Sequence, residues 1–454
     1  MTRKLFGTDG VRGVAGELLS AELALGLAQA ATRLTQAERP RVVIVRDTRE
    51  SGEMLQAAVA AGVAAAGGEA LLGGVLPTPA APLLIARYGF DLAAMLSASH
   101  NPYQDNGIKF FGGDGHKLSD DTELEIEREL ERVAGEGETD ATAAGHAGVA
   151  GSPPQVGRIR ELRGASEDYL RELHTRFADL DLNGLDVVLD CANGATYRVA
   201  PEIFRRLGAN VTVIADTPDG RNINAECGST HIERLAERVV AGGHALGFAF
   251  DGDGDRVLAV DGAGKVVDGD ELMALAALHL RGSGRLRGDG VVVTVMTNYG
   301  FHTAMAEVGI EVARTQVGDR YVLAELLARG WTLGGEQSGH LIELGFNRTG
   351  DGIAGALLTL EALAGGDLRE RHAMAKLPQR LVNVRVRDRE ALHDSEAVIA
   401  AIRVEDEALS GRGRVLVRPS GTEPLVRVMV EAPTDAEAQE VCDRLVTLVQ
   451  SELS

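Results

Sequence analysis

A strand–helix–strand–helix–strand pattern recurs three times within residues 1–340. Its first strands are 42–45, 187–189 and 291–293, and a helical stretch that ends in glycine follows each of them. Alternating strands and helices of this kind predict a parallel sheet with right-handed crossovers. Three unrelated α/β segments are the alternative, but each third strand leads into a polar loop at the same place in the pattern. The pattern therefore predicts three similar α/β domains.

The last part of the chain has a different pattern. Apolar runs at 381–386, 415–417 and 426–430 predict a small sheet. A closing helix is expected to begin at Thr434, whose hydroxyl can cap it while Glu437 reaches back in a capping box. We therefore predict an α/β fold with three similar parallel-sheet α/β domains plus a smaller α+β C-terminal domain.

Breaks in these patterns indicate the domain boundaries. The Gly- and Ala-rich run 134–154 is typical of a loose linker, and further breaks follow Asp255 and surround Gly365. The predicted domains are 1–153, 154–256, 257–368 and 369–454.

Length and composition agree with several domains and exclude some functions. The chain of 454 residues is too long for one hydrophobic core. Its net charge of −21 argues against nucleic acid, whose binding depends on neutralising phosphates. The sequence shows no signal peptide, no run of apolar residues that could span a bilayer, and no disulfide or zinc spacing among its three cysteines. We expect a cytoplasmic protein that binds neither nucleic acid nor membranes, and the sequence leaves open whether it forms a homodimer.

Four short polar loops, each preceded by an apolar run, carry most of the chemistry. Ligands of open α/β sheets bind beyond the carboxyl ends of the strands, so such loops can converge on one cleft. The loops are 97–102, 251–256, 335–340 and 418–424. In so acidic a chain, an anionic substrate requires basic residues that are concentrated locally. The basic residues in or beside Gly-rich loops are Arg12, Lys109, Arg256, Arg320, Arg418 and Arg427.

Asp251, Asp253 and Asp255 alternate with glycine after an apolar strand. Alternate side chains of an extended backbone point the same way, so the three carboxylates can meet one hard cation. An EF-hand is excluded, because its sixth and twelfth positions hold Arg256 and Gly262 here. A cluster of Asp–Gly turns is the alternative, but the adjacent Arg256 favours a metal and phosphate site. We expect Mg²⁺ rather than Ca²⁺.

Ser99 is a candidate phosphoryl carrier. A serine just before Asn101 and Pro102 is most often a turn or cap residue. Lys109, however, follows an Asp-Asn-Gly turn that can fold it back towards the serine. A Ser–His–Asp hydrolase is the rival interpretation, but the Gly-x-Ser-x-Gly elbow is absent from the sequence. A serine beside cations suits phosphoryl transfer, which depends mainly on charge and positioning.

The other loops offer groups that recognise a sugar phosphate. Glu336 can accept hydrogen bonds from vicinal sugar hydroxyls, and Ser338 can donate to them; an ordinary strand-end loop is the alternative. Arg418 can bind phosphate bidentately, in an anion-binding nest with Ser420, Gly421 and Thr422. Arg12, among the glycines of 7–13, can also reach an anion, although a simple turn explains that loop equally well.

Together these loops, in their order and spacing, resemble the α-D-phosphohexomutase superfamily over essentially the whole chain. The segments 6–13, 97–102 and 335–340 are most similar to the bacterial phosphoglucosamine mutase family. The resemblance implies three α/β domains and a smaller fourth around a central cleft. It also implies an isomerase that converts glucosamine 6-phosphate into glucosamine 1-phosphate, which supplies amino sugar for UDP-N-acetylglucosamine and cell-wall synthesis. A phosphoglucomutase or phosphomannomutase of the same superfamily is the alternative.

The resemblance implies a role for each candidate residue. Ser99 would be the phosphoserine and would bind Mg²⁺ together with Asp251, Asp253 and Asp255. Phospho-Ser99 would phosphorylate the sugar to a bound sugar 1,6-bisphosphate, which also primes the enzyme, and would take the other phosphate back. The residues expected to bind the substrate are Arg256, Glu336, Ser338, Arg418, Ser420, Gly421, Thr422 and Arg427.

Either Lys109 or His340 is expected to take the proton from the receiving hydroxyl. Lys109 would need its pKa lowered by neighbouring cations such as Arg12, whereas His340 would need little tuning. Two rival functions remain: a metal-dependent sugar phosphatase would release free phosphate, and a phosphosugar sensor would need neither Ser99 nor three metal-binding carboxylates.

Overall fold

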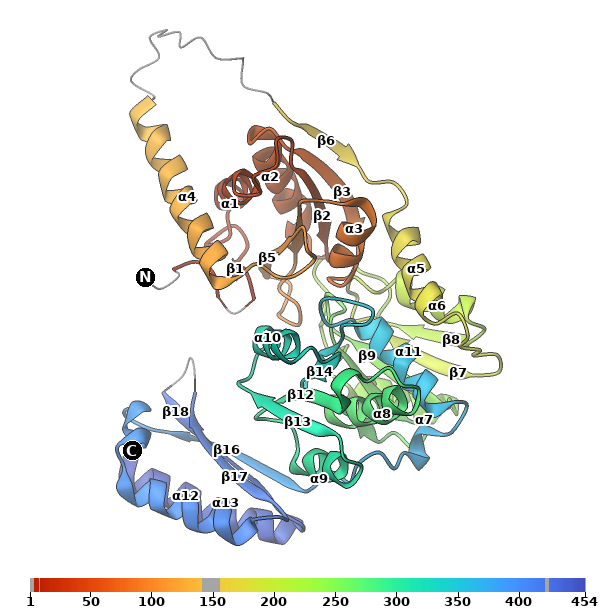
Figure 1. Cartoon of the computed structure of the whole chain (residues 1–454), viewed down its shortest axis with the longest axis vertical. Helices are drawn as coiled ribbons and strands as arrows, with labels where there is room; N and C mark the ends of the chain where they lie inside the picture. The colour runs from red at the N-terminus through yellow and green to blue at the C-terminus, as the bar shows by residue number, and fades with distance from the viewer. Residues whose placement is uncertain (1–3, 8, 141–155, 421–423, 454) are drawn as a thin grey trace. The chain divides into compact units, whose positions relative to one another are not determined.

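The computed structural model describes residues 4–7, 9–140, 156–420 and 424–453 (Figure 1). The chain forms two compact units. The first consists of Met1–Val295 with Ala313–Arg371, and the second consists of Met296–Val312 with His372–Ser454. The three predicted domain boundaries stay predictions.

Three sheets repeat one strand order, which confirms the threefold pattern (Figure 1). In each sheet the first strand of the pattern lies between the second and the third, as in β4-β2-β3, β9-β7-β8 and β14-β12-β13. A fourth strand, which the sequence analysis did not predict, pairs antiparallel with the third in every sheet. The sheets are therefore mixed, and each functional loop joins a parallel strand to its antiparallel neighbour.

The first sheet has the order β1-β5-β4-β2-β3-β6. The β-branched residues of β2 favour an extended strand, and Val42 and Ile44 pack in a core with Leu27 and Val59 of the covering helices. The strands are β1 (Val11–Val14), β2 (Arg41–Arg46), β3 (Glu69–Val75), β4 (Leu92–Leu96), β5 (Asp105–Gly112) and β6 (Arg158–Glu161). The helices are α1 (Ala21–Arg33), α2 (Ser51–Ala65), α3 (Ala80–Tyr88) and α4 (Asp120–Asp140).

The second sheet has the order β11-β10-β9-β7-β8. All five residues of β9 are buried, so this strand leads from the core straight into the predicted metal loop. The strands are β7 (Asp186–Asp190), β8 (Asn210–Ile214), β9 (Leu246–Phe250), β10 (Val257–Asp261) and β11 (Val266–Val267). The helices are α5 (Ala165–Arg176), α6 (Val199–Arg206) and α7 (Glu233–Gly242).

The third sheet has the order β13-β12-β14-β15. The side chain of Asp268 caps α8 by accepting from Glu271 N, and Asp351 caps α11 by accepting from Ala354 N. The strands are β12 (Gly290–Thr294), β13 (Glu311–Thr315), β14 (Leu333–Gly335) and β15 (Leu341–Glu343). The helices are α8 (Gly269–Gly282), α10 (Asp319–Arg329) and α11 (Gly352–Leu363), whereas α9 (Tyr299–Glu307) belongs to the second unit.

The second unit contains the predicted small sheet, with the order β16-β18-β17. Its strands are β16 (Gln379–Arg385), β17 (Arg414–Pro419) and β18 (Leu425–Glu431). The closing helix α13 (Asp435–Leu453) follows Thr434, whose Oγ1 accepts from Glu437 N at 3.2 Å as expected for the cap. A second helix, α12 (Glu396–Leu409), was not predicted, and its residues Val398 and Leu409 share the core of this sheet.

Helix α4 corrects the prediction of a loose linker at 134–154. The helix continues to Asp140, so residues 134–140 are helical. Gly135 and Gly137 each cost about 1 kcal/mol in a helix, and the surrounding helix-forming residues offset this cost. Residues 141–155 lie outside the described part of the chain. Among the described residues, no helix has the length and apolar content needed to cross a membrane.

Candidate active site

Ser99 lies in the loop between β4 and β5, and its side chain is buried. Its φ of +53° is in the left-handed region, which a non-glycine residue adopts at an energetic cost. Such conformations cluster at functional sites. Ser99 Oγ donates a hydrogen bond to Asp251 Oδ2 at 2.5 Å, so the serine loop and the acidic loop meet.

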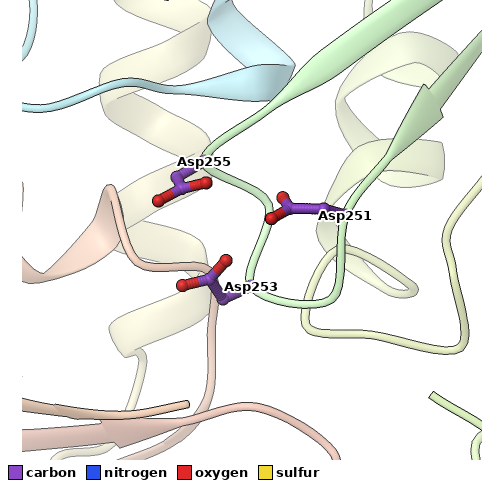
Figure 2. A group of neighbouring side chains, drawn as sticks. All are labelled: Asp251, Asp253 and Asp255. Carbon is purple, nitrogen blue, oxygen red and sulfur yellow. The ribbon is translucent and has the colours of Figure 1, made fainter. Parts of the chain in front are cut away.

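The three aspartates lie in the loop between β9 and β10, and their carboxylates face one another (Figure 2). One oxygen atom from each of Asp251, Asp253 and Asp255 lies within 4.8 Å of the others. Asp253 Oδ1 and Asp255 Oδ1 are buried and have no hydrogen-bond partner among the described residues. Burial raises the pKa of Asp251 well above its usual value, and the charges of Asp255 and Asp253 raise it further. Clustered oxygen ligands with unsatisfied lone pairs fit a divalent cation.

Glycine at position 252 is what allows the serine and acidic loops to approach. A Cβ atom on Gly252 would lie 2.6 Å from Ser99 O and 2.8 Å from Asn224 Nδ2. Backbone atoms cannot move away as a flexible side chain can, so a larger residue here would separate Ser99 from Asp251.

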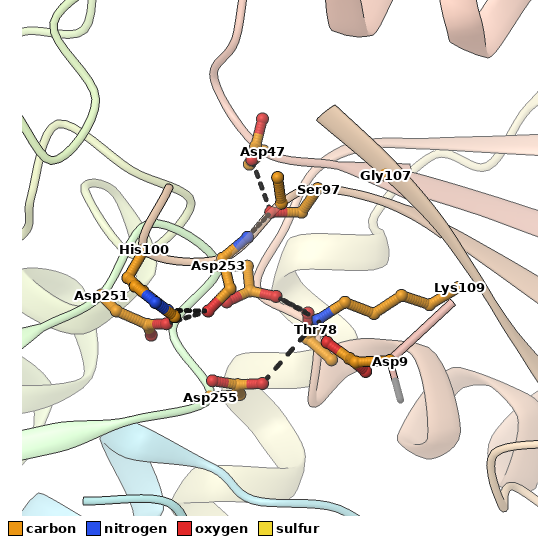
Figure 3. Close-up of polar contacts among 12 residues, drawn as sticks. Asp9, Asp47, Thr78, Ser97, His100, Gly107, Lys109, Asp251, Asp253 and Asp255 are labelled. Atoms are coloured by element: carbon orange, nitrogen blue, oxygen red, sulfur yellow. Dashed lines mark hydrogen bonds and ion pairs between the residues drawn. The ribbon is translucent and has the colours of Figure 1, made fainter. Parts of the chain in front are cut away.

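Lys109 lies on β5, opposite Met95 of β4, and is buried (Figure 3). Its Nζ lies 2.9 Å from Asp253 Oδ2, 2.8 Å from Asp9 Oδ2 and 3.9 Å from Asp255 Oδ2. Burial opposes the charged form, but the attraction of these three carboxylates outweighs it and raises the pKa of Lys109. With this raised pKa, Lys109 is an ammonium ion in this state and would have to lose its proton before it could act as a base.

A cavity of about 410 Å³ opens beside the acidic loop, a size suited to a small-molecule ligand. Five of the predicted site residues line it: Arg12, Asp255, Arg256, Glu336 and His340. Three titratable residues that the sequence analysis did not assign also line it: Asp9, His100 and Asp319.

Asp9 and Asp319 are joined through Lys117. Lys117 Nζ donates to Asp9 Oδ1 at 2.6 Å and makes a short ion pair with Asp319 Oδ2. Arg12 pairs with the other oxygen of Asp9. Burial favours the neutral acid, but Lys109, Lys117 and Arg12 hold the pKa of Asp9 well below its usual value. Acidic and basic side chains therefore alternate along this wall of the cavity.

His340 lies between two carboxylates. Its Nδ1 is 3.7 Å from Asp255 Oδ2, and its Nε2 is 3.8 Å from Asp319 Oδ2. Burial lowers the pKa of His340, but Asp255 and Asp319 outweigh it and raise the pKa. Gly350 N donates to Nε2 at 3.1 Å, which requires a lone pair there. The neutral ring therefore carries its proton on Nδ1, towards Asp255, and both ring nitrogens are engaged.

Arg256 carries a positive charge in the cavity, whereas its neighbour His100 is neutral. Arg256 N donates to Asp251 Oδ1 at 3.2 Å, and the Arg256 guanidinium lies 3.3 Å from His100 Nδ1. Burial lowers the pKa of His100 to about 4, with Arg256 and Arg12 contributing in the same direction. His100 is therefore neutral near pH 7 and leaves Arg256 as the local cation.

Only part of loop 335–340, which was predicted to recognise the sugar, lines the cavity. Glu336 is buried, and its Oε1 accepts from Gly318 N at 2.9 Å, which fixes the carboxylate against the loop before α10. Ser338 is exposed, and Gln337 Nε2 donates to Asp268 Oδ2 at 3.2 Å. Of these residues, Glu336 lines the cavity.

In the second unit, Arg418 and Arg427 are direct cross-strand partners on β17 and β18. Like charges at such positions repel one another. Burial lowers the pKa of Arg418, and Arg427 lowers it further. Two adjacent guanidinium groups of this kind favour an anion as ligand. Ser420 is buried beside them, and Gly421 and Thr422 lie outside the described residues.

One residue of the predicted basic set serves a different purpose. Arg320 donates to Asp120 Oδ1 at 2.5 Å and Glu123 Oε2 at 3.4 Å, so it binds the start of α4 and does not line the cavity. The residues that were missed had weak local signals. Asp9 shares the Gly-rich loop of Arg12, and Asp319 follows a glycine directly before α10.

Sequence models of the phosphoglucomutase/phosphomannomutase family match four consecutive parts of the chain. The alpha/beta/alpha domains I, II and III match residues 3–136, 167–264 and 268–381, and the C-terminal domain matches residues 381–448.

Solved structures with this fold include distant relatives. A phosphoglucomutase/phosphomannomutase family protein from Burkholderia thailandensis has a TM-score of 0.80 at 22% identity, and the similarity covers 100% of this chain and 99% of that one. An N-acetylphosphoglucosamine mutase from Aspergillus fumigatus, solved with GlcNAc-6P and magnesium, has a TM-score of 0.68 at 18% identity, with 99% and 96% covered. These similarities show the fold.

Two relatives of higher sequence identity share one function. The phosphoglucosamine mutase of Moorella thermoacetica is 52% identical over 443 residues, which cover 96% of this chain and 97% of that protein. The phosphoglucosamine mutase of Leifsonia xyli subsp. xyli is 47% identical over 471 residues, with 99% of each protein covered. The chain therefore belongs to the phosphoglucosamine mutase family of the phosphohexomutase superfamily, a family of isomerases.

Proposed function

We propose that the chain interconverts glucosamine 6-phosphate and glucosamine 1-phosphate through phosphorylated Ser99 and a bound sugar 1,6-bisphosphate. One observation carries this proposal: Ser99 Oγ lies 2.5 Å from Asp251 Oδ2, in a buried cluster that also contains Lys109. A hydroxyl among carboxylates and a cation suits phosphoryl transfer, which needs charge and positioning more than covalent chemistry. The choice of an amino sugar as the substrate is supported by the similarity of the chain to two phosphoglucosamine mutases.

Asp251, Asp253, Asp255 and Ser99 Oγ are the proposed ligands of Mg²⁺. Two buried carboxylate oxygens without a hydrogen-bond partner among the described residues support a cation here, and the related fungal enzyme was solved with magnesium. When bound, the ion supplies positive charge that offsets the negative charge of the transferring phosphoryl group.

In the first transfer, the bond from phosphorus to Ser99 Oγ breaks and a bond to the sugar hydroxyl forms, while the hydroxyl proton passes to a base. The second transfer returns the other phosphate to Ser99. The Lys109 ammonium neutralises charge beside Asp253, and Glu336, fixed by Gly318 N, accepts from the sugar hydroxyls. Lys109 and His340 stay the two candidates for the base.

Glucosamine 6-phosphate is expected to be the preferred substrate. A single additional charge-assisted contact to the 2-ammonium group is worth about 1.5–3 kcal/mol, which corresponds to roughly ten- to a hundred-fold in kcat/KM. The measurement compares kcat/KM for glucosamine, glucose and mannose 6-phosphates on one enzyme preparation. A higher value for glucose or mannose would identify a phosphoglucomutase or phosphomannomutase, and release of free phosphate over time would identify a phosphatase.

Arg418→Ala is expected to raise KM by roughly ten- to a hundred-fold for both glucosamine 6-phosphate and glucosamine 1-phosphate. The reason is that one proposed clamp holds the non-reacting phosphate in either orientation of the sugar, and a hydrogen bond to a charged group is worth about 1.5–3 kcal/mol. Arg412→Ala is the control, because Arg412 is exposed and pairs with Glu437. An effect on only one isomer would place the clamp elsewhere.

A further inference from the structure

Arg49, just after β2, is a wholly buried arginine that the proposed reaction does not use. Its Nε donates to Asp47 Oδ2 at 2.8 Å, and both side chains have 0% exposure. Removing two charges from water costs several kcal/mol per ion, and only good geometry and further hydrogen bonds offset that cost. Arg49 therefore needs acceptors for its other N–H groups.

Those acceptors are backbone carbonyl groups of the Ser99 loop. One terminal nitrogen of Arg49 donates to Ser99 O at 2.9 Å and to Asn101 O at 2.8 Å. The other donates to Asp105 O at 2.9 Å and makes a short hydrogen bond to Pro102 O. With the bond to Asp47, the five N–H groups of the guanidinium are satisfied. Four backbone carbonyl groups of residues 99–105 thus accept hydrogen bonds from one side chain.

Asp47 holds the same loop through Ser97 (Figure 3). Ser97 Oγ donates to Asp47 Oδ2 at 2.6 Å and accepts from Ser99 N at 2.9 Å. The peptide groups on both sides of Ser99 are therefore fixed, its N–H through Ser97 and its carbonyl by Arg49 together with Asn224, whose Nδ2 also donates to Ser99 O at 2.9 Å.

We propose that Arg49 and Asp47 form a positioning pair that holds Ser99 at its positive φ, so that Ser99 Oγ meets the Asp251 carboxylate. The proposal rests on the proposed role of Ser99 as phosphoryl carrier. Backbone strain of this kind persists only where the surroundings fix the residue, and the pair supplies much of that restraint. Arg49 contacts only backbone in this loop, so it acts through the position of Ser99.

Arg49→Lys tests the pair, because lysine keeps the charge but offers three N–H donors in place of five. The measurement is single-turnover transfer of phosphate from glucose 1,6-bisphosphate to Ser99, followed by intact mass. We expect the transfer rate to fall about 10²-fold, since a displacement of about 1 Å has an effect of that size. The final fraction of phosphorylated molecules and the KM for the sugar phosphate should stay unchanged. A merely structural role would lower that final fraction and leave the rate intact.

Arg176→Lys is the matched control. Arg176 in α5 donates to Glu343 Oε1 at 2.9 Å and to Glu361, and within the described part of the chain these polar partners lie outside the loops of the site. Its substitution should leave the transfer rate unchanged. A wild-type rate in Arg49→Lys would overturn the proposal, whereas failure of the wild-type protein itself to take phosphate would overturn the proposed function and this inference with it.

Ser97→Ala tests the same positioning pair if Arg49→Lys does not fold. It removes the link from Asp47 to Ser99 N and leaves the buried ion pair in place. We expect transfer roughly fivefold slower with full final phosphorylation, the factor that corresponds to one hydrogen bond of about 1 kcal/mol. An unchanged transfer rate in this variant would overturn the proposal.

Discussion

Ser99→Ala is expected to abolish mutase activity, with kcat lowered by on the order of 10⁴-fold or more, because no other route carries the phosphoryl group once the nucleophile is lost. The side chain is buried, and alanine fits where serine does. The left-handed backbone costs the two residues about the same, so the melting temperature should change little. The measurement is a coupled assay with added glucose 1,6-bisphosphate, together with intact mass after exposure to that compound. The wild-type protein should gain one phosphate and the variant none.

Ser97→Ala is the control for this experiment, because it removes a buried hydroxyl from the same loop. It should still gain one phosphate, only more slowly. Substantial activity of Ser99→Ala in the presence of the sugar bisphosphate would contradict the assignment of Ser99 as carrier and would point to direct transfer between two bound sugars.

Short motifs at strand ends could be recognised in the sequence, and pairings between distant residues could not. Ser99, Asp251 and Glu336 each follow the third strand of a repeat, so their motifs and their place in the fold were readable together. Lys117 and Asp319 are 202 positions apart, and their ion pair arises only when the first and third sheets are placed together. The fourth strand of the third repeat, β15, has three residues, too few for a periodic pattern.

Lys109 shows that a sequence motif does not predict the protonation state of a residue. The sequence predicted that Lys109 folds back towards Ser99, but it predicted neither the contacts of Lys109 with the aspartates nor its protonation. The sequence suggested Arg12 as the neighbour that would lower the pKa of Lys109. In the fold, Asp253, Asp9 and Asp255 all lie within 4 Å of the ammonium group, and they outweigh both burial and Arg12. A pKa depends on every charge around a group, and most of those charges come from other loops.

Removing the metal is expected to stop turnover, and Mg²⁺ should restore it. Burial raises the pKa of Asp251, and the charges of Asp255 and Asp253 raise it further, so a divalent cation bound to these carboxylates should also stabilise the folded protein. A ligand at a hundred times its Kd stabilises the native state by about 2.7 kcal/mol. The melting temperature of chelator-treated protein should therefore rise as Mg²⁺ is added.

Asp251→Asn distinguishes a loss of metal binding from a loss of folding stability. The amide relieves the repulsion among the aspartates, its oxygen can still accept from Arg256 N, and its NH2 group can donate to Ser99 Oγ, so the metal-free variant should melt at or above the wild-type temperature. It should lose the rise in melting temperature with Mg²⁺ and most of its activity. Asp190→Asn is the matched control, because burial also raises the pKa of Asp190, which likewise ends a strand of the same sheet. This control should keep both responses to Mg²⁺. Full activity of exhaustively chelated wild-type protein, or an unchanged Mg²⁺ response in Asp251→Asn, would show that the aspartates do not hold the ion.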